Sequence, residues 1–511
     1  MIKTEQILKN ERIRVNEYLL PRTEPELLRI IDDEMIRKSY DILIRDDKSG
    51  CKVLLANDKI EDLEIMFKLF HRIGDDGIKD MAKIFENYVL SQGHELLNQR
   101  ADRIKGKDKS HDPEFVKALL ALHKKYSNLL QDTFRNHPCF DMSLKNSFED
   151  FINEKVGETK NLVLLSSYCD ALLKKVDGNL EESLKNILQL FLYLCEKDRF
   201  VDEYRNQLAK RLLSHNPTSP DDEKIMIIEL KHQCGAEFTS KLEGMLQDFE
   251  LGSKIRSEFN RREHAGRDSV DFAAHVISPN HWPAHETPDV TIPSMITEQC
   301  IDVFTAWYED INNGNRHLKW IHSVGSVTIE AVYGRKKYTL LVMPLQAIVL
   351  NALNDGRSIS FTKLGEELNI DGAILKPVLH SLCCAKHKLV SKVPNNKKID
   401  KGDHFVANSG FKAEKRKILI PMPSLTKSSN SRNVEQNRKY IMEAAVVRIM
   451  KARRTMRHQQ LLAEVLRQLV FFKPNSRDIR KVIESLIERE YLERSEDGQS
   501  YNVRQINGSH E

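Results

Sequence analysis

The stretch Ile441–Leu462 reads IMEAAVVRIMKARRTMRHQQLL, and its residues up to Met456 have the spacing of an amphipathic helix. On a helical wheel its apolar residues form one stripe, made by Ile441, Ala445, Ile449, Ala452 and Met456. Lys451 lies well off the centre of this stripe. We therefore expect its amine to reach solvent.

Downstream of this helix the pattern predicts further helices and a hairpin. Helical periodicity continues over His458–Val470 and Arg477–Glu490. The closing stretch Tyr491–Val503 contains Asp497-Gly498, a dipeptide that favours a tight hairpin turn. This order predicts a winged helix over residues 434–511.

A similar order of elements precedes it. From Leu345 a helix runs to Gly356, and helices follow around Phe361–Leu368 and Ala373–Leu382 before a basic hairpin. Another winged helix is therefore predicted over residues 345–420. Residues 421–433 between the two are rich in Ser, Pro and Asn, which is typical of a flexible linker.

Further upstream the pattern changes from strands to helices. Val327–Tyr333 and Tyr338–Val342 alternate with period two around Gly334, so residues 261–344 predict a small α/β domain with a β-hairpin. The first half of the chain instead predicts long helices. One of them carries apolar residues at helical spacing, namely Leu180, Leu184, Ile187, Leu188, Phe191 and Cys195. The fold class expected for the whole chain is mainly α.

Composition limits the function. The 511 residues include 79 basic and 75 acidic ones, so bulk charge does not favour nucleic acid or membrane binding. The eight cysteines lack C-x-x-C spacing, which argues against a zinc site, and we expect them to be reduced. No apolar run is long enough to cross a bilayer. We expect the cytoplasm and nucleus, with no membrane partner.

Several motifs resemble those of one family. Ala444–Lys451 with Arg453 and His458–Leu462 is similar to the cullin segment that receives a ubiquitin-like modifier. Other stretches resemble the cullin-homology signature, namely Cys234-Gly235 with Glu237–Met245, Leu208–Leu213 and Trp282-Pro283. The resemblance covers nearly the whole chain and is closest to the cullin-1-like subgroup.

The resemblance implies a domain map. Residues 1–153 would be the end of a stalk of helical cullin repeats, and residues 154–260 a four-helix bundle. The α/β domain over residues 261–344 would bind a RING-box protein, which carries zinc and recruits a ubiquitin-conjugating enzyme. Residues expected to form this seat are Phe304, Trp307, Tyr308, Leu318, Trp320, Val327 and Ile329. The alternative for these side chains is ordinary core packing.

The family also implies two charged sites. Lys451 would accept the ubiquitin-like modifier through an isopeptide bond, and the arginines around it could dock an acidic conjugating enzyme. The alternative is a solvated basic helix face. A basic surface expected to attract the conjugating enzyme comprises Lys412, Lys415, Arg416 and Lys417. The alternative there is a strand edge protected by lysines.

The function implied is a scaffold of a ubiquitin-protein ligase complex, with no catalytic residue, metal or cofactor of its own. Arg454 stands where cullins commonly have another lysine, which leaves Lys451 alone between Lys439 and Lys473. The early cullin repeats that hold an adaptor and substrate receptor are not found in this sequence. Whether an adaptor binds is therefore uncertain at this stage.

Two other classes remain as alternatives. Winged helices with basic faces could make a nucleic-acid-binding regulatory protein, although the helix Arg477–Glu490 carries acidic residues that would repel phosphates. Salt-dependent DNA binding would favour that class. An enzyme is the other alternative, but the metalloprotease, P-loop and serine-hydrolase motifs are absent.

Overall fold

The computed structural model describes residues 2–18, 20–104, 111–155, 157, 159–174, 180–214, 219–262, 271–284, 287–396, 398–421, 429–469, 471–495 and 500–503. The chain divides into two compact units. The first comprises residues 1–203 and 445–511, and the second comprises residues 204–444.

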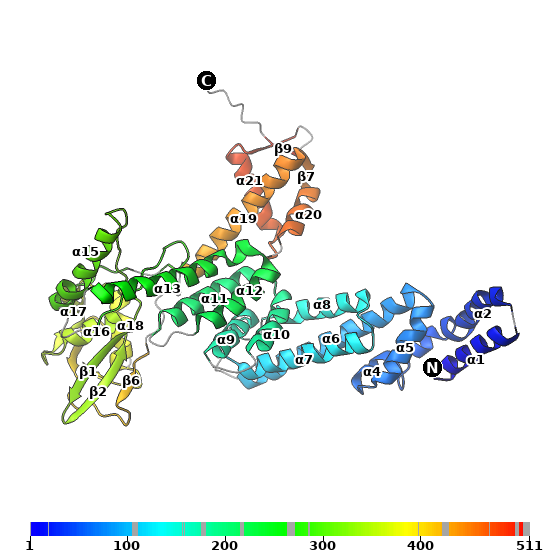
Figure 1. Cartoon of the computed structure of the whole chain (residues 1–511), viewed down its shortest axis with the longest axis horizontal. Helices are drawn as coiled ribbons and strands as arrows, with labels where there is room; N and C mark the ends of the chain where they lie inside the picture. Colours follow the sequence, from blue (N-terminus) through cyan, green and yellow to red (C-terminus); the bar gives the residue numbers. More distant parts are fainter. Residues whose placement is uncertain are drawn as a thin grey trace, which may run out of the picture. The chain divides into compact units, whose positions relative to one another are not determined.

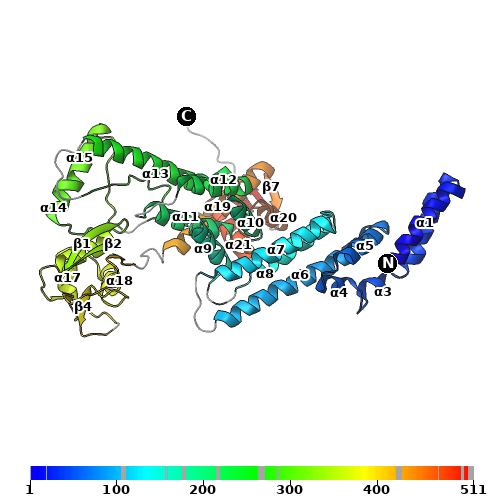
Figure 2. The ribbon, with the colours of Figure 1, turned by 60° about the horizontal axis from the view of Figure 1, so that its bottom comes forward.

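The first unit is built mainly of helices. The first five are α1 (Ile2–Tyr18), α2 (Glu24–Ile31), α3 (Tyr40–Arg45), α4 (Cys51–Ala56) and α5 (Ile60–Arg72). The longer ones are α6 (Asp75–Ile104), α7 (Pro113–Asp132), α8 (Pro138–Ile152), α9 (Asn161–Leu173) and α10 (Leu180–Leu192). Figures 1 and 2 both show α6, α7 and α8 lying side by side.

The contact between α6 and α8 depends on a residue without a side chain. A Cβ atom at Gly93 would overlap the ring of Phe151, which is fully buried. The sequence also defines where α7 begins, because the side chain of Asp112 accepts a hydrogen bond from the N–H of Phe115 at 3.1 Å. Pro113 occupies the first turn of that helix, where its missing N–H costs nothing.

The second unit begins with helices that carry the signature-like motifs. They are α11 (Lys197–Leu212), which starts in the first unit, α12 (Pro220–Cys234) and α13 (Ala236–Arg262). The guanidinium of Arg211 donates to Glu223 at 2.6 Å, and the hydroxyl of Tyr204 donates to the same carboxylate at 2.8 Å. All three side chains are buried, so this motif holds α11 against α12.

A similar structural role falls to the other motifs. A Cβ atom at Gly244 of α13 would lie 2.5 Å from the ring of His281. One turn later, the Asp248 carboxylate accepts hydrogen bonds from Trp282 Nε1 at 2.9 Å and from the Ser278 N–H at 2.9 Å. Two motifs that are far apart in sequence thus meet, and they fasten the irregular segment around Trp282 to α13.

The rest of the second unit contains α14 (Ser294–Ile296), α15 (Asp302–Ile311) and a small sheet. This sheet has the order β1-β2-β6, with β1 (Val327–Tyr333) antiparallel to β2 (Lys336–Val342). β6 (Lys417–Leu419) runs parallel to β2, with Thr339 opposite Lys417. Figure 1 shows the three strands side by side.

Two segments of the chain have the same order of helices and strands. Module A (residues 344–407) has α16 (Pro344–Ala352), β3 (Ile359–Ser360), α17 (Phe361–Leu368), α18 (Gly372–Cys383), β4 (Val390–Val393) and β5 (His404–Ala407). Module B (residues 429–503) has α19 (Ser429–Arg453), β7 (Thr455–Arg457), α20 (His458–Gln468), α21 (Ser476–Glu488), β8 (Leu492–Arg494) and β9 (Ser500–Val503). Their sheets have the matching orders β3-β5-β4 and β7-β9-β8. This is the order of elements predicted for the winged helices.

The mainly α fold class is thus confirmed, with an α/β part in the second half of the chain. Module A and the sheet of β1, β2 and β6 share one hydrophobic core. α19 begins at Ser429, so the last residues of the predicted linker are helical. Residues 422–428 of that linker, the Asp497-Gly498 turn and the tail lie outside the described residues. The domain boundaries inferred from the sequence stay predictions.

Candidate functional site

Lys451 lies in the last turn of α19, and its side chain is exposed. The buried side of this helix is formed by Met442, Ala445, Val446, Ile449 and Met450. The predicted apolar stripe is therefore partly wrong, because Ile441 is 43% exposed and Ala452 is exposed as well. The stripe is rotated, yet Lys451 still lies outside it. Among the described residues no carboxylate pairs with its amine.

The helix that carries Lys451 ends in a tight turn. Arg454 has a φ of +65°, in the left-handed region that favours glycine. Its N–H donates to the carbonyl of Met450 at 2.7 Å, and its own carbonyl accepts from the N–H of Val503 at 3.1 Å. Lys451 therefore stands three residues before a turn that is tied into the sheet of module B.

The surroundings of Lys451 are basic. Arg448, Arg453, Arg454 and Arg457 are all exposed, and Arg448 donates to Gln468 Oε1 at 3.1 Å. An acidic residue of α20, Glu464, interacts electrostatically with Arg453. A hydrogen bond from Arg467, then one from Gln468, holds the pKa of Glu464 below its usual value. The lysine thus occupies an exposed, positively charged surface at the end of a rigid helix.

The loop between α20 and α21 contacts the helices of the first unit. The N–H of Lys197 donates to the carbonyl of Phe471 at 2.9 Å, and Glu196 and Phe472 form an isolated antiparallel bridge. Lys473 donates to Glu149 at 3.0 Å, and this hydrogen bond raises the pKa of Lys473. We call residues 471–473 the anchor loop. The sequence carried no signal for it, because main-chain pairing between distant segments leaves no local pattern.

The predicted RING-box residues fall into two clusters. Phe304 and Tyr308 of α15 are buried around Phe259 of α13, with Trp307, Leu318 and Trp320 partly buried against them. Val327 and Ile329 on β1 instead pack against the core of the sheet and module A. The structure thus groups five of the seven residues, and Phe259 and Phe272 complete a cluster that the sequence did not predict.

Two tryptophans in the aromatic cluster differ in hydrogen bonding. Trp320 Nε1 donates to Thr305 Oγ1 at 3.2 Å. Trp307 Nε1 is buried and has no acceptor among the described residues. A buried N–H group without an acceptor costs free energy. Trp307 therefore carries an unmet hydrogen-bond donor.

The basic residues predicted at positions 412–417 are exposed, and the structure enlarges their surface. The N–H of Thr339 on β2 donates to the carbonyl of Arg416 at 2.8 Å, so β6 begins beside the turn between β1 and β2. The turn and the start of β2 add the exposed residues Arg335, Lys336 and Lys337. We call the enlarged set the hairpin basic surface, made of Arg335, Lys336, Lys337, Lys412, Lys415, Arg416 and Lys417. Within the described part of the chain none of these is in an ion pair.

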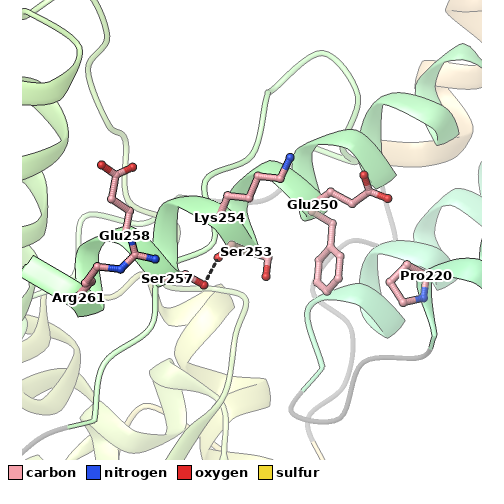
Figure 3. A pocket seen from close by; sticks show the side chains of 8 residues that line it. Pro220, Glu250, Ser253, Lys254, Ser257, Glu258 and Arg261 are labelled. Carbon is pink, nitrogen blue, oxygen red and sulfur yellow. Dashed lines mark hydrogen bonds between the residues drawn. The ribbon is translucent and has the colours of Figure 1, made fainter.

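A pocket of about 590 Å³ opens along α13. Figure 3 shows acidic, basic and hydroxyl side chains along the helix, with Ser257 donating to the carbonyl of Ser253 at 2.9 Å. Glu250 on its rim pairs with Lys224 at 2.8 Å. These groups can bind charges, and the lining includes no cysteine or histidine.

In the ranges that the structure describes, no three His, Cys, Asp or Glu side chains group as a metal site. None of the described helices combines the length and apolar composition needed to cross a bilayer.

Comparison with known proteins places these features in one family. Residues 1–256 match the cullin alpha solenoid domain, residues 276–411 the cullin alpha+beta domain, and residues 437–498 the cullin protein neddylation domain. Together these matches define a cullin architecture with a solenoid domain, an alpha+beta domain and a neddylation domain. The chain belongs to the cullin family.

Individual relatives agree with this assignment. The chain is 34% identical to cullin-1 of Oryza sativa subsp. japonica, with 96% of this chain and 68% of the relative covered. It is 33% identical to cullin-2 of Arabidopsis thaliana, covering 97% of this chain and 69% of the relative. Identity to cullin-3A of Arabidopsis thaliana is 33%, over 96% of this chain and 68% of the relative.

Proposed function

We propose that the chain is the non-catalytic scaffold subunit of a cullin-RING ubiquitin-protein ligase that acts in protein degradation. It binds a RING-box protein and is activated by an isopeptide bond between Lys451 and a ubiquitin-like modifier. The observation that carries this proposal is an exposed Lys451 inside the segment that matches the cullin neddylation domain. The scaffold contributes proximity, because it holds a charged conjugating enzyme near substrate lysines. We expect it in the cytoplasm and nucleus.

The RING-box protein would bind beside β1. In the described sheet β1 has β2 as its neighbour on one side only, so its other edge can pair with a strand. Alternate side chains of β1, including Val327 and Ile329, pack inward and hold the strand in place. The unmet donor of Trp307 supports a partner surface at the aromatic cluster too, since a main-chain carbonyl of the partner would satisfy it.

A proline scan of residues 328–332 tests this seat. Proline removes one N–H, so it blocks a partner strand only where that N–H points away from β2. We expect proline at every second position to abolish co-purification of a RING-box protein, while the circular dichroism spectrum of these variants stays unchanged. Equal binding by all folded variants would contradict pairing at β1.

The tryptophans provide a matched pair of variants. Trp307→Phe removes a donor that has no acceptor, so we expect the free chain to keep its stability and RING-box binding to weaken about tenfold. Trp320→Phe removes the bond to Thr305 and should destabilise the free chain by about 1 kcal/mol. Unchanged RING-box affinity in Trp307→Phe would remove the aromatic cluster from the interface.

Activation would act through the anchor loop. The anchor loop contacts the first unit through the bridge between Glu196 and Phe472 and the ion pair between Lys473 and Glu149, and a bulky attached domain would have to displace both. A modifier on Lys451 would release module B and free the RING-box subunit to reach substrates. A disulfide between Glu149→Cys and Lys473→Cys should then keep a modified ligase slow until it is reduced, and equal rates before and after reduction would contradict this route.

The conjugating enzyme would be attracted by the hairpin basic surface. Exposed basic residues without ion-pair partners raise the association rate of an acidic partner, and salt screens this effect. Charge reversal of Lys415, Arg416 and Lys417 should slow association about tenfold at low salt and far less at high salt. Reversal of Lys386, Lys398 and Lys401, three exposed basic residues of module A, is the control that matches the change in net charge. An equal effect of both sets would show that only net charge matters.

A further inference from the structure

Two adjacent cysteines end α18 in module A. Cys383 is the last helical residue, and Cys384 caps the helix by donating its N–H to the carbonyl of His380 at 3.0 Å. Their Sγ atoms are 3.3 Å apart. Successive side chains on a helix point about 100° apart, so this closeness requires that both thiols turn toward one another.

The two sulfurs differ in access. Cys383 is 6% exposed and Cys384 is half-buried, so a small reagent can reach one thiol first and the other from it. Burial, then the hydrogen bond with Cys384, raises the pKa of Cys383 to about 12. Both groups face the hairpin of module A, because Cys384 Sγ lies 3.9 Å from the carbonyl of Asn396 and the ammonium of Lys392 acts on Cys383.

Two adjacent residues are too close along the chain for a relaxed disulfide. Adjacent Cα atoms are about 3.8 Å apart, which is shorter than the usual span across a disulfide. A soft atom with bonds of about 2.3 Å to each sulfur would instead subtend an angle of about 90° at the observed separation. That angle is too small for the tetrahedral geometry of zinc. It suits a pyramidal centre with a lone pair, such as trivalent arsenic.

We propose that Cys383 and Cys384 form a dithiol site for trivalent organic arsenicals. An arsenical of the type R–As=O would react with both thiols. Two S–H bonds break, two As–S bonds form, and the oxygen leaves as water with the two protons. Arsenic stays trivalent, so no oxidant or reductant is needed. Because the thiols meet at the end of α18, the bridge would clamp the last helical residue to its cap.

The test uses the full chain and phenylarsine oxide as the probe. After incubation, excess monothiol is added and the intact mass is measured, and then a dithiol is added. We expect one phenylarsenic group to survive the monothiol and to leave with the dithiol. Retention should fall roughly a hundredfold in Cys384→Ser, because the second bond would otherwise form intramolecularly.

Cys139→Ser is the matched control, because Cys139 is another half-buried thiol at a helix end. It should retain the group like the wild type. Cys384 is partly exposed, so its serine variant is expected to fold, and circular dichroism checks this even if Cys383→Ser is unstable. Full retention in folded Cys384→Ser, or no monothiol-resistant group on the wild type, would overturn the proposal.

Discussion

Modules A and B have the same order of helices and strands, yet they differ in the connection between the first helix and the first strand. In module A, α16 ends at Ala352 and residues 353–358 lead to β3, with Gly356 at a φ of +69°. In module B, α19 ends at Arg453 and Arg454 alone joins it to β7, at a φ of +65°. Module B therefore holds its last helical turn, with Lys451, close to its sheet. One topology thus supports two different surfaces, and function follows from the site rather than the fold.

Their attachments differ as well. Module A encloses an ion pair between Lys392 and Asp403 at 2.8 Å, with side chains 3% and 5% exposed. Module B instead sends its anchor loop to Glu149, Glu196 and Lys197. Module A is stabilised by a buried ion pair and shares the core of the neighbouring sheet, whereas module B contacts other helices through its anchor loop.

The largest loss of stability should come from breaking the buried ion pair of module A. Lys392→Met leaves the carboxylate of Asp403 buried without its partner, which should cost about 3–5 kcal/mol. Hydrogen exchange of α18, β4 and β5 measures this locally. Lys398→Met removes an exposed lysine of the same hairpin and should change little. If the double variant Lys392→Met with Asp403→Leu regains the lost stability, the loss in Lys392→Met comes from the unpaired carboxylate and not from packing. A loss of stability near zero in Lys392→Met would contradict the buried pair.

Opposite substitutions at the two left-handed residues after the first helices should have opposite effects on stability. Gly356→Ala forces a side chain into the left-handed region and should destabilise module A by about 1 kcal/mol. Arg454→Gly relieves the same conformation and should stabilise module B by a similar amount, about 1 kcal/mol. Thermal unfolding followed by hydrogen exchange gives both values. Changes of the same sign would show that the two turns are not equivalent.

A smaller effect is expected at the anchor loop. Lys473→Glu places a like charge beside Glu149 and should weaken the contact by up to about 1 kcal/mol, because both side chains are partly exposed. Faster exchange of the Lys197 amide is the readout, since that amide bonds to Phe471. Adding Glu149→Lys should restore protection. If the double variant exchanges as fast as the single one, the ion pair does not hold the loop.

The smallest effect is a difference in pH dependence. Burial first, then Arg480, holds the pKa of His458 in module B below its usual value. The unfolded chain then binds more protons, so module B should lose stability as the pH falls below about 6.5. The hydrogen bond from Lys392 lowers the pKa of Asp403, so its contribution is present above about pH 3.9 and is lost as the pH falls through the folded value. His458→Gln should flatten the slope of module B alone, and an unchanged slope would exclude this histidine.

Local patterns in the sequence predicted much of this architecture. The helix predicted at Phe361–Leu368 has those bounds, and the hairpin of β1 and β2 was located by its alternation alone. The parallel pairing of β6 with β2 joins segments that are distant in sequence, which no periodicity reveals. The stripe of α19 was misplaced because packing, rather than hydrophobicity, decides that Met442, Val446 and Met450 are buried.

The candidate site was predicted through motifs. Lys451 was found from the residues around it, since helical geometry alone showed only that the lysine would be exposed. The sequence predicted only Lys412, Lys415, Arg416 and Lys417 of the hairpin basic surface, because the pairing of β2 with β6 that adds Arg335, Lys336 and Lys337 joins distant segments. The anchor loop was missed for the same reason.

The most direct test of the account is the modification of Lys451. Protein purified from cells is digested with trypsin, and mass spectrometry is used to search for a Gly-Gly remnant on lysines. We predict the remnant on Lys451 and the loss of the heavier band in Lys451→Arg, with Lys439→Arg, on the same helix, as the matched control that keeps it. A heavier band that persists in Lys451→Arg, or a remnant only on another lysine, would contradict the assignment.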